Sequence, residues 1–587
     1  MSDKEKVYDT KKGTKIQYKT RKRSKISNRK PVNRFSIEQD IEYVSTSAKK
    51  LKLSKDECNC GDDVELDNAF GYRLLNFVAV FSAISELVQC KTCQTNVKFT
   101  ETSKRGLGFK IVVSCEKCEK TYINSCPLVG HAYEVNKRIV LAMRLLGIGL
   151  HGIKKFCAFM ELPRPIFQSF YDKIVTNISL ATAAVREQSM KKAAAEEQRR
   201  ATEKGETSGL TVSGDGSWRK RGFSSLFGVT TLIGRFTGKV LDLLVKSKYC
   251  KACEFWSKKE GTIEYEEWAE SHSDNCQSNH EGSAGKMEVD SVVEMFSRSE
   301  ALHGLKYKYY IGDGDSKTFK GILDAEPYEN FTVVKKECIG HVQKRMGTRL
   351  RALVKKEKGL SGKGKLTGKL IDELSIYYGL AICRHCNNTI EEMRKAIWAT
   401  LRHKLSTDAK PQHEDCPADA DTWCSWQRAK AANTLHEYKH KPALNERVYE
   451  AIKPTYTDLS SDDLLTRCLG GHTQNNNECF NSVIWSIAPK CTSSGKLLVD
   501  IAADIAVLTF NDGLSSLMKV MEVLGMKIGD ICYNFCLETD ASRIDNAEHR
   551  MIEAAKNARR ASTSSRKEED ETHINLEGQL YGAGIAE

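Results

Sequence analysis

Three acidic residues stand in short motifs that could hold metal ions. Asp215 and Asp313 each lie in a Gly-Asp-Gly sequence, and Glu478 follows three asparagines. Clustered carboxylates repel one another unless cations lie between them, and Mg²⁺ or Mn²⁺ is held mainly by such oxygens. Two of these ions, about 3.5–4 Å apart, can activate an attacking oxygen and stabilise a leaving oxygen at phosphorus. The three acids therefore predict phosphodiester chemistry, with Asp215 bridging the ions and Asp315 assisting or replacing Asp313.

Each motif taken alone also has a purely structural interpretation. Gly-Asp-Gly is typical of tight turns, and the asparagines before Glu478 are typical of a helix N-terminus. The catalytic interpretation is favoured because all three acids stand where a strand is expected to end or a helix to begin. It also accounts for the glycines beside both aspartates, which would let a phosphate backbone approach closely.

Alternating strands and helices must position these acids. Strand-like runs, with a helix expected over 287–302 before the fourth of them, cover residues 210–213, 225–233, 239–245, 307–311 and 331–335. Their order predicts an α/β RNase H-like core in which the fourth strand lies beside the first, so that Asp215 and Asp313 meet at adjacent strand ends. Glu478 opens a helix that would carry its carboxylate to the same cleft, because its buried face is formed by Phe480, Val483, Ile484 and Ile487.

The rest of the chain divides into segments of different composition. We predict a basic disordered arm at 1–65, a zinc-ribbon-like module at 66–130, a helical domain at 131–208, the first part of the core at 209–341 with a zinc-binding insertion at 249–285, a helical insertion at 342–472, the C-terminal core helices at 473–545 and a largely disordered tail at 546–587. In the helical domain, helices joined at Leu162-Pro-Arg-Pro165 fit either a DNA-binding helix-turn-helix or a plain linker, with a polar helical spacer following over 185–204.

The net charge of +13 is concentrated at the start of the chain. Residues 1–34 hold 13 lysines and arginines against three acids, centred on Lys19-Thr-Arg-Lys-Arg23. Such an arm is typical of a nuclear import signal with non-specific phosphate contacts, or simply of a solvated disordered end. The start shows no secretory signal, and the longest apolar run, Phe77 to Val88, is too short to span a membrane. We therefore expect a nuclear protein without a membrane segment.

The 21 cysteines predict zinc sites rather than disulfides, because many of them stand at ligand spacing in a chain expected to be intracellular. In the clearest group, a predicted hairpin separates Cys90 and Cys93 from Cys115 and Cys118. Two such knuckles can present four thiolates to Zn²⁺ in a tetrahedron. The alternative is four reduced cysteines in a hydrophobic core.

A second group lies between the third strand and the following helix. Cys250, Cys253, His272 and Cys276 suit a closed site with three thiolates and one imidazole, and His280 is an alternative ligand. We expect this site to hold structural zinc, because thiolate-rich sites select zinc whereas carboxylate sites select Mg²⁺ or Mn²⁺.

A third group lies in the helical insertion and has looser spacing. It consists of His403, His413, Cys416 and Cys424, with Cys383-Arg-His-Cys386 as a competing half-site. We predict a third structural zinc site here, with the choice between these ligands left open.

Taken together, the motifs resemble one known family. They are, in chain order, Gly214-Asp-Gly-Ser-Trp218, Gly285-Lys-Met-Glu288 with Arg298-Ser299, Gly312-Asp-Gly-Asp-Ser316, Cys338-x-x-His341, and Asn475-Asn-Asn-Glu-Cys-Phe-Asn-Ser482 leading to Trp485 and Pro489-Lys490. The segment from Leu74 to Lys519 is similar to Mutator-like transposases of eukaryotic DNA transposons, particularly those of animals. A related superfamily with a similar layout, Kolobok, remains an alternative.

The resemblance implies a DDE-type RNase H-like core with a helical insertion before the glutamate. Asp215, Asp313 and Glu478 would be its catalytic triad, with Cys338 and His341 in support. The implied activity is cleavage of double-stranded DNA at terminal inverted repeats and joining of the 3′ ends to target DNA, by at least a dimer.

Two rival hypotheses belong to other functional classes. One is a domesticated, non-catalytic, sequence-specific DNA- or chromatin-binding zinc protein, and the other is an RNase H-like nuclease acting on RNA or hybrids. The presence of all three acids favours an active enzyme. The expected zinc and helical modules ahead of the core favour a protein that must find particular DNA ends.

Overall fold

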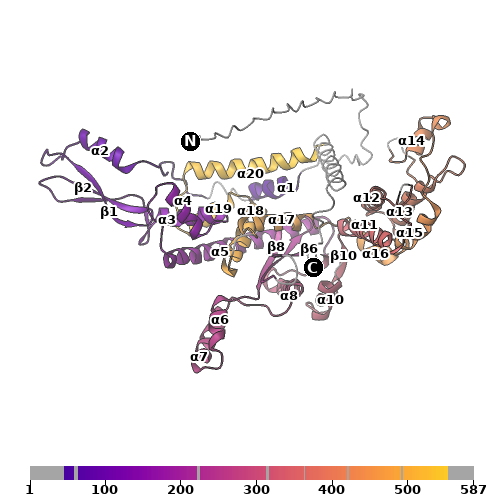
Figure 1. The fold of residues 1–587 in the computed structure, drawn as a ribbon, viewed down its shortest axis with the longest axis horizontal. Coiled ribbons are helices and arrows are strands. Elements are labelled where there is room, and N and C mark those ends of the chain that lie inside the picture. Colours follow the sequence, from indigo (N-terminus) through magenta and orange to yellow (C-terminus); the bar gives the residue numbers. More distant parts are fainter. Residues whose placement is uncertain are drawn as a thin grey trace, which may run out of the picture.

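A computed structural model describes residues 45–57, 64–220, 225–312, 316–362, 364–418, 422–490 and 494–552. Asp313, Asp315, the basic run around Lys19-Thr-Arg-Lys-Arg23 and the expected tail after residue 552 lie outside the described residues. Figure 1 shows a central sheet with its covering helices, a hairpin module at one end and a group of helices at the other.

A five-stranded mixed sheet forms the centre of the described structure. Its strands are β6 (Leu210–Trp218), β7 (Phe227–Gly234), β8 (Val240–Ser247), β9 (Tyr307–Gly312) and β10 (Val334–Glu337). The order across the sheet is β10-β9-β6-β7-β8, with β6, β7 and β8 antiparallel and β6, β9 and β10 parallel. The strands lie close to their predicted positions, and the fourth of them pairs with the first as expected.

The first strand of this sheet is longer than predicted. Asp215 was expected to end the strand, but β6 continues to Trp218 because residues from Asp215 onward pair with β7, with Asp215 opposite Thr231. Pairing with β9 stops earlier, where Ser213 lies opposite Ile311. Asp215 therefore lies inside an antiparallel pair, two residues beyond the parallel part of β6, and its predicted place at the strand end is wrong.

Helices cover both faces of the sheet. On one face, α17 (Asn475–Ile487) and α18 (Lys496–Asp512) share a hydrophobic core with β7 and β8. On the other face, α8 (Ala284–Ser297) packs against β7, and α10 (Ser316–Ala325) connects β9 to β10. Strand side chains alternate between the two faces, and both faces are covered by helices, so every residue of β7 is buried.

One long helix, α5 (Gln168–Glu203), runs beside α18. The sequence predicted a helix after Leu162-Pro-Arg-Pro165 and a helical spacer following over 185–204, but the structure joins them into a single helix of 36 residues. The residues between the two predicted parts contain no glycine or proline, and Ile178 and Ala181 continue the buried face.

The N-terminal module contains a three-stranded antiparallel sheet of β1 (Lys98–Arg105), β2 (Gly108–Ser114) and β3 (Thr121–Asn124). The first two strands form the hairpin predicted between the two cysteine pairs, and α2 (Phe77–Leu87) packs on β1. This module leads to the long helix through β4 (Leu128–Val129), β5 (Ala132–Tyr133), α3 (Glu134–Leu145) and α4 (Leu150–Phe159).

The helices between β10 and α17 pack around a separate hydrophobic core. They are α11 (Ile339–Lys356), α12 (Gly368–His385), α13 (Ile390–Leu405), α15 (Glu446–Asp458) and α16 (Asp462–Cys468), whereas the short α14 (Ser425–Ala431) contributes no residue to this core. In α11, Val342, Met346 and Leu350 are 0 % exposed and recur one turn apart, so one face of this helix is buried and the opposite face lies at the surface.

The remaining helices lie beside the core or project from it. α6 (Lys251–Trp256) and α7 (Ile263–His272) extend away from the sheet after β8 (Figure 1). The others are α1 (Thr46–Glu57), α9 (Ser299–His303), α19 (Ser516–Val523) and α20 (Asp530–Met551). Among the parts of the chain that the structure describes, no helix combines the length and the apolar character needed to cross a membrane.

Candidate carboxylate and metal-binding sites

Three side chains of α17 bond to three alternate residues of β6. The spacing is four residues on the helix and two on the strand: Asn477 bonds to Ser213 (Nδ2 to the backbone oxygen, 3.1 Å), Asn481 to Asp215 (Nδ2 to Oδ2, 2.7 Å) and Trp485 to Ser217 (Nε1 to Oγ, 2.7 Å). Four helical residues rise about 6 Å and two strand residues about 6.6 Å, so the helix and the strand stay in step. The position of α17 along β6 is therefore set by side-chain hydrogen bonds.

The carboxylate of Asp215 is held by this arrangement. Asn481 donates to one carboxylate oxygen, and Gln474, the residue before α17, donates to the backbone oxygen of Gly214 at 2.7 Å. The amide oxygens of Asn481 and Gln474 are buried and have no hydrogen-bond partner among the described residues. Carboxylate and amide oxygens are the ligands that hard divalent cations prefer, so the oxygen atoms around Asp215 fit Mg²⁺ or Mn²⁺ as ligands.

Glu478 lies in the first turn of α17, as predicted. It precedes Asn481 by three residues, and residues at this spacing are neighbours on a helix surface. Its side chain is 59 % exposed and faces α11, where it lies 3.9 Å from His341 Nε2 and 3.6 Å from Lys344 Nζ. Glu478 therefore lies one helical turn before the residue that bonds to Asp215.

The strand that leads to Asp313 lies next to the strand of Asp215. β9 ends at Gly312, and its residue Ile311 pairs with Ser213 of β6. Asp313 and Asp315 themselves lie outside the described residues. The geometry of the predicted acids is therefore described for Asp215 and Glu478.

The glycines beside the aspartates make room for protein side chains. A Cβ atom at Gly214 or Gly312 would lie 2.5 or 2.6 Å from the ring of Tyr310, which is 2 % exposed. At Gly216 it would lie 2.8 Å from Glu288 Oε2 on α8. The expectation that these glycines admit a phosphate backbone is wrong at Gly214, Gly216 and Gly312, because Tyr310 and Glu288 fill the space. Gly314 lies outside the described residues.

Cys338 and His341 stand at the start of α11. Cys338 is the buried residue that precedes the helix, and His341 points its Nε2 toward Glu478. The backbone of Ile339 donates to the carbonyl oxygen of His472 at 3.0 Å, which joins the start of α11 to the segment that precedes α17. Burial, with Arg235 and Lys336 nearby, lowers the pKa of His472 to about 3, so this imidazole is neutral.

The first cysteine group is brought together as predicted. The sulfur atoms of Cys90, Cys93, Cys115 and Cys118 all lie within 4.8 Å of one another. Hydrogen bonding from Thr95 lowers the pKa of Cys93 to about 6. Metal binding requires thiolates, so a thiol that loses its proton near neutral pH fits a zinc ligand.

The second group also gathers around one point, at the base of the projecting helices. The ligand atoms of Cys250, Cys253, His272 and Cys276 lie within 4.8 Å of one another. His280, the alternative ligand, is instead 3.4 Å from Asp290. Trp268 stacks on His272 with ring centroids 4.5 Å apart, which fixes the imidazole plane.

The third group forms a buried cluster in the helical insertion. The ligand atoms of His403, His413, Cys416 and Cys424 lie within 4.8 Å of one another, whereas the competing half-site at 383–386 is not part of this group. The neighbouring Cys416 thiol lowers the pKa of Cys424 to about 4 against the effect of burial. Burial lowers the pKa of His413, which keeps this imidazole neutral, as a metal ligand must be.

Two residues that the sequence analysis did not select support this third group. His440 Nε2 lies 3.0 Å from His413 Nε2, and Asp408 Oδ1 lies 2.7 Å from His440 Nδ1. Such carboxylate and histidine partners fix the ring orientation of a ligand histidine. The spacing of Asp408 and His440 in the sequence contains no signal of this role, because the loop between them brings the two together.

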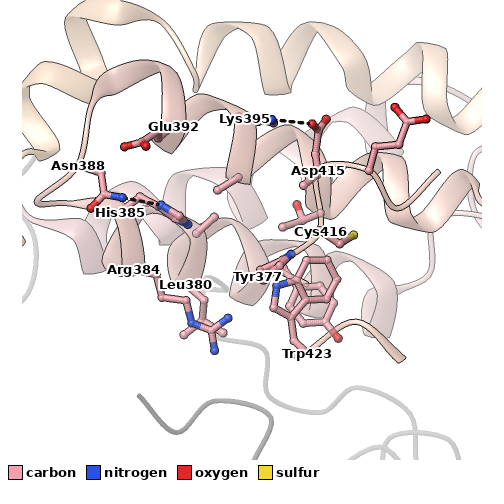
Figure 2. Close-up of a pocket in the computed structure, with 16 residues that line it drawn as sticks. Tyr377, Leu380, Arg384, His385, Asn388, Glu392, Lys395, Asp415, Cys416 and Trp423 are labelled. Atoms are coloured by element: carbon pink, nitrogen blue, oxygen red, sulfur yellow. Dashed lines mark hydrogen bonds and ion pairs between the residues drawn. The ribbon is translucent and has the colours of Figure 1, made fainter. Parts of the chain in front are cut away.

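A hollow of about 380 Å³ lies between α12, α13 and the third cluster. Figure 2 shows Tyr377 and Trp423 on one side and His385 with Asn388 on another, while Lys395 pairs with Asp415 at 3.4 Å. Cys416 of the third cluster lines the same hollow. The pocket therefore belongs to the helical insertion and not to the carboxylate site on β6.

Fold and sites together define a mixed α/β protein with a carboxylate on its central strand and three Cys/His clusters that could bind zinc. The sequence model of the Mutator-like transposase family matches residues 71–424, which is more than half of the chain. The chain therefore belongs to the Mutator-like transposase family, and the predicted resemblance is confirmed. Membership implies DNA binding and metal-dependent transposition chemistry. The match includes Asp215 and all three clusters, and Glu478 lies beyond it. No curated protein matches the chain.

Proposed function

We propose that this protein is a DNA transposase that uses Asp215, Asp313 and Glu478 to hold two Mg²⁺ or Mn²⁺ ions at an RNase H-like core. The observation that carries the proposal is the alignment of α17 with β6, through the 2.7 Å bond from Asn481 to Asp215. It brings the helix of Glu478 to the strand of Asp215. The sheet order supports the fold assignment, because a parallel strand and an antiparallel strand flank β6.

Each residue of the site has a distinct task in this proposal. The ions, when bound, supply the charge that activates the attacking oxygen and stabilises the leaving oxygen. Asp215, oriented by Asn481, would hold these ions together with Glu478 and Asp313. Lys344, 3.6 Å from Glu478, would reduce the repulsion between the acids.

The three Cys/His clusters would hold structural zinc. Each offers four ligand atoms within 4.8 Å of one another and at least two thiolates, a donor set that selects zinc and leaves no position for substrate. We propose that they brace the N-terminal module, the projecting helices and the helical insertion.

The substrate would be double-stranded DNA, both the terminal inverted repeats of a transposon and the target into which the 3′ ends are joined. We further propose that the protein works in the nucleus and as a homo-oligomer. The basic run Lys19-Thr-Arg-Lys-Arg23 supports nuclear import and phosphate contacts. Two DNA ends must be brought together for joining, which supports an assembly of at least two chains.

The test compares cleavage by the natural protein with that by Asp215→Asn and Glu478→Gln. Each is incubated with Mn²⁺ or Mg²⁺ and a duplex carrying the inverted repeats that flank the gene. We expect nicking by the natural protein, no product above background with either variant, and normal activity for the control Asp324→Asn at an exposed position of α10. Binding without cutting by the natural protein would overturn the enzymatic proposal and support the domesticated DNA-binding alternative.

A further inference from the structure

The surface face of α11 carries a row of hydrogen-bond donors. His341, Lys344, Arg345, Thr348 and Arg349 line a hollow of about 490 Å³ along this helix. They recur at spacings of three and four residues, so they share one face, opposite the buried Val342, Met346 and Leu350. A face made of lysine, arginine, histidine and threonine side chains offers many hydrogen-bond donors and is suited to an anionic ligand with several charges.

This row starts at the proposed catalytic site. Its first two members, His341 and Lys344, are the residues that face Glu478 at 3.9 and 3.6 Å. From His341 to Arg349 the helix rises about 12 Å, a length that spans only a few phosphates of one DNA strand. The row is therefore long enough to contact a short run of DNA backbone, and it begins beside the proposed catalytic site.

The two arginines of the row pair with acidic residues that differ in their exposure to solvent. Arg345 pairs at 2.5 Å with Glu337, which is 1 % exposed, so this pair belongs to the interior. Arg349 pairs at 3.3 Å with Asp458, and both side chains are about half exposed or more, at 48 and 69 %. Exposed ion pairs contribute about 0–1 kcal/mol, so a phosphate can replace Asp458 as the partner of Arg349.

We infer that the face of α11 formed by Lys344, Thr348 and Arg349 binds the sugar-phosphate backbone of the DNA strand beside the scissile phosphate. This inference rests on the proposed function, because the scissile phosphate is placed at Asp215 and Glu478. On this inference, α11 at the start of the helical insertion contacts the DNA substrate. Arg345 takes no part, since the buried Glu337 holds it.

Binding is best measured without cutting, in the Asp215→Asn protein. The probe is a fluorescein-labelled duplex of mixed sequence, about 30 base pairs long, titrated at about 50 to 200 mM KCl. Each lost phosphate contact should lower affinity about eightfold at about 0.1 M salt and reduce the slope of log affinity against log salt by about one. We therefore expect both changes for Lys344→Ala and again for Arg349→Ala.

Lys191→Ala is the matched control. Lys191 on α5 is 58 % exposed and pairs with Glu187 at 3.2 Å, much as Lys344 is 69 % exposed and pairs with Glu478 at 3.6 Å. Equal losses for Lys191→Ala and Lys344→Ala would show a general charge effect and overturn the inference. Arg349→Ala provides an independent check, since Arg349 pairs with Asp458 and not with an acid of the proposed catalytic site.

A second measurement locates the contact. A photo-crosslinking amino acid in place of Thr348 should attach to the duplex, whereas the same replacement at Ile376, 45 % exposed on α12, should not. No crosslink from position 348 in a protein that binds the duplex would overturn the inference. If the natural protein binds DNA through Lys344 and Arg349 but never cuts it, the proposed enzyme fails and the backbone-binding face stands.

Discussion

The carboxylate site and the three Cys/His clusters are assembled in different ways. Each cluster draws its four ligands from one short stretch of chain, and the ligand atoms already lie within 4.8 Å of one another. The carboxylate site depends on Asp215 and Asn481, which are 266 residues apart. The clusters therefore need only local folding, whereas the carboxylate site exists only if α17 docks on β6 in the correct register.

Surroundings differ between the two kinds of site as well. The clusters offer closed sets of four ligand atoms, with sulfur in all three and imidazole in two, that could bind zinc. Glu478, in contrast, is 59 % exposed and faces His341 and Lys344 of α11. A closed site suits structural support and an open one suits chemistry on a large substrate, so the two kinds of site should respond differently to the same perturbation.

The largest effect is expected from loss of metal at the first cluster. Structural zinc binding contributes on the order of 10 kcal/mol to the folding of a small module. Cys115→Ser should therefore remove one equivalent of zinc and abolish hydrogen-exchange protection in β1, β2 and β3. Cys383→Ser, at an exposed cysteine outside the clusters, should change neither quantity. Unchanged exchange and circular dichroism after chelation would argue against a metal at this site.

The next largest effect should come from undocking α17. Asn477 is 0 % exposed and bonds to Ser213 and Thr231, so Asn477→Ala removes two or three buried hydrogen bonds. At about 1 kcal/mol each, plus unsatisfied partners, we expect a loss of about 2–4 kcal/mol in the free energy of unfolding. Zinc content should stay the same.

Urea denaturation and zinc analysis of Asn477→Ala and Asn475→Ala would check this. Asn475 is the exposed first residue of the same helix, and its replacement should cost much less. Equal stability of the two variants would contradict the importance of the contact between α17 and β6. A loss of zinc in Asn477→Ala would contradict the idea that the clusters need only local folding, whereas the carboxylate site needs α17 docked on β6.

The smallest effect concerns the support of the third cluster. Removing the partner of a ligand histidine costs about 10- to 100-fold in metal affinity. His440→Ala should therefore speed zinc release from this cluster by that factor and leave release from the first cluster unchanged. His436→Ala is the control, because His436 is 74 % exposed and pairs with Glu437, its neighbour in the chain. Release can be followed with a chromogenic chelator, and equal rates for both variants would remove the proposed role of His440.

Much of this arrangement could be predicted from the amino-acid sequence. The order of strands in the central sheet, the hairpin between the first cysteine pairs and the main ligand set of each cluster agree with the prediction, whereas β6 and β10 differ from their predicted bounds. Strand patterns and ligand spacings are local properties, and local properties are visible in a linear sequence. The family could be recognised for a related reason, because several short motifs recur in a set order.

Other features depended on contacts that no local pattern encodes. The length of β6 beyond Asp215 follows from its pairing with β7, and the single long α5 follows from the partner helix α18 that covers its buried face. The glycines around Asp215 were assigned to substrate access, but Tyr310 and Glu288 occupy that space.

The sequence by itself determined the family, the order of strands and helices and the candidate ligands of the three clusters, because each rests on residues near one another in the chain. Only the tertiary structure decided that Asn481 holds Asp215, that Glu478 faces Lys344, and that His440 supports His413. The physical reason is that these contacts form between elements whose docking depends on the packing of the whole core. Short local motifs therefore identify the candidate functional residues of this protein, and the tertiary fold determines which of them lie together.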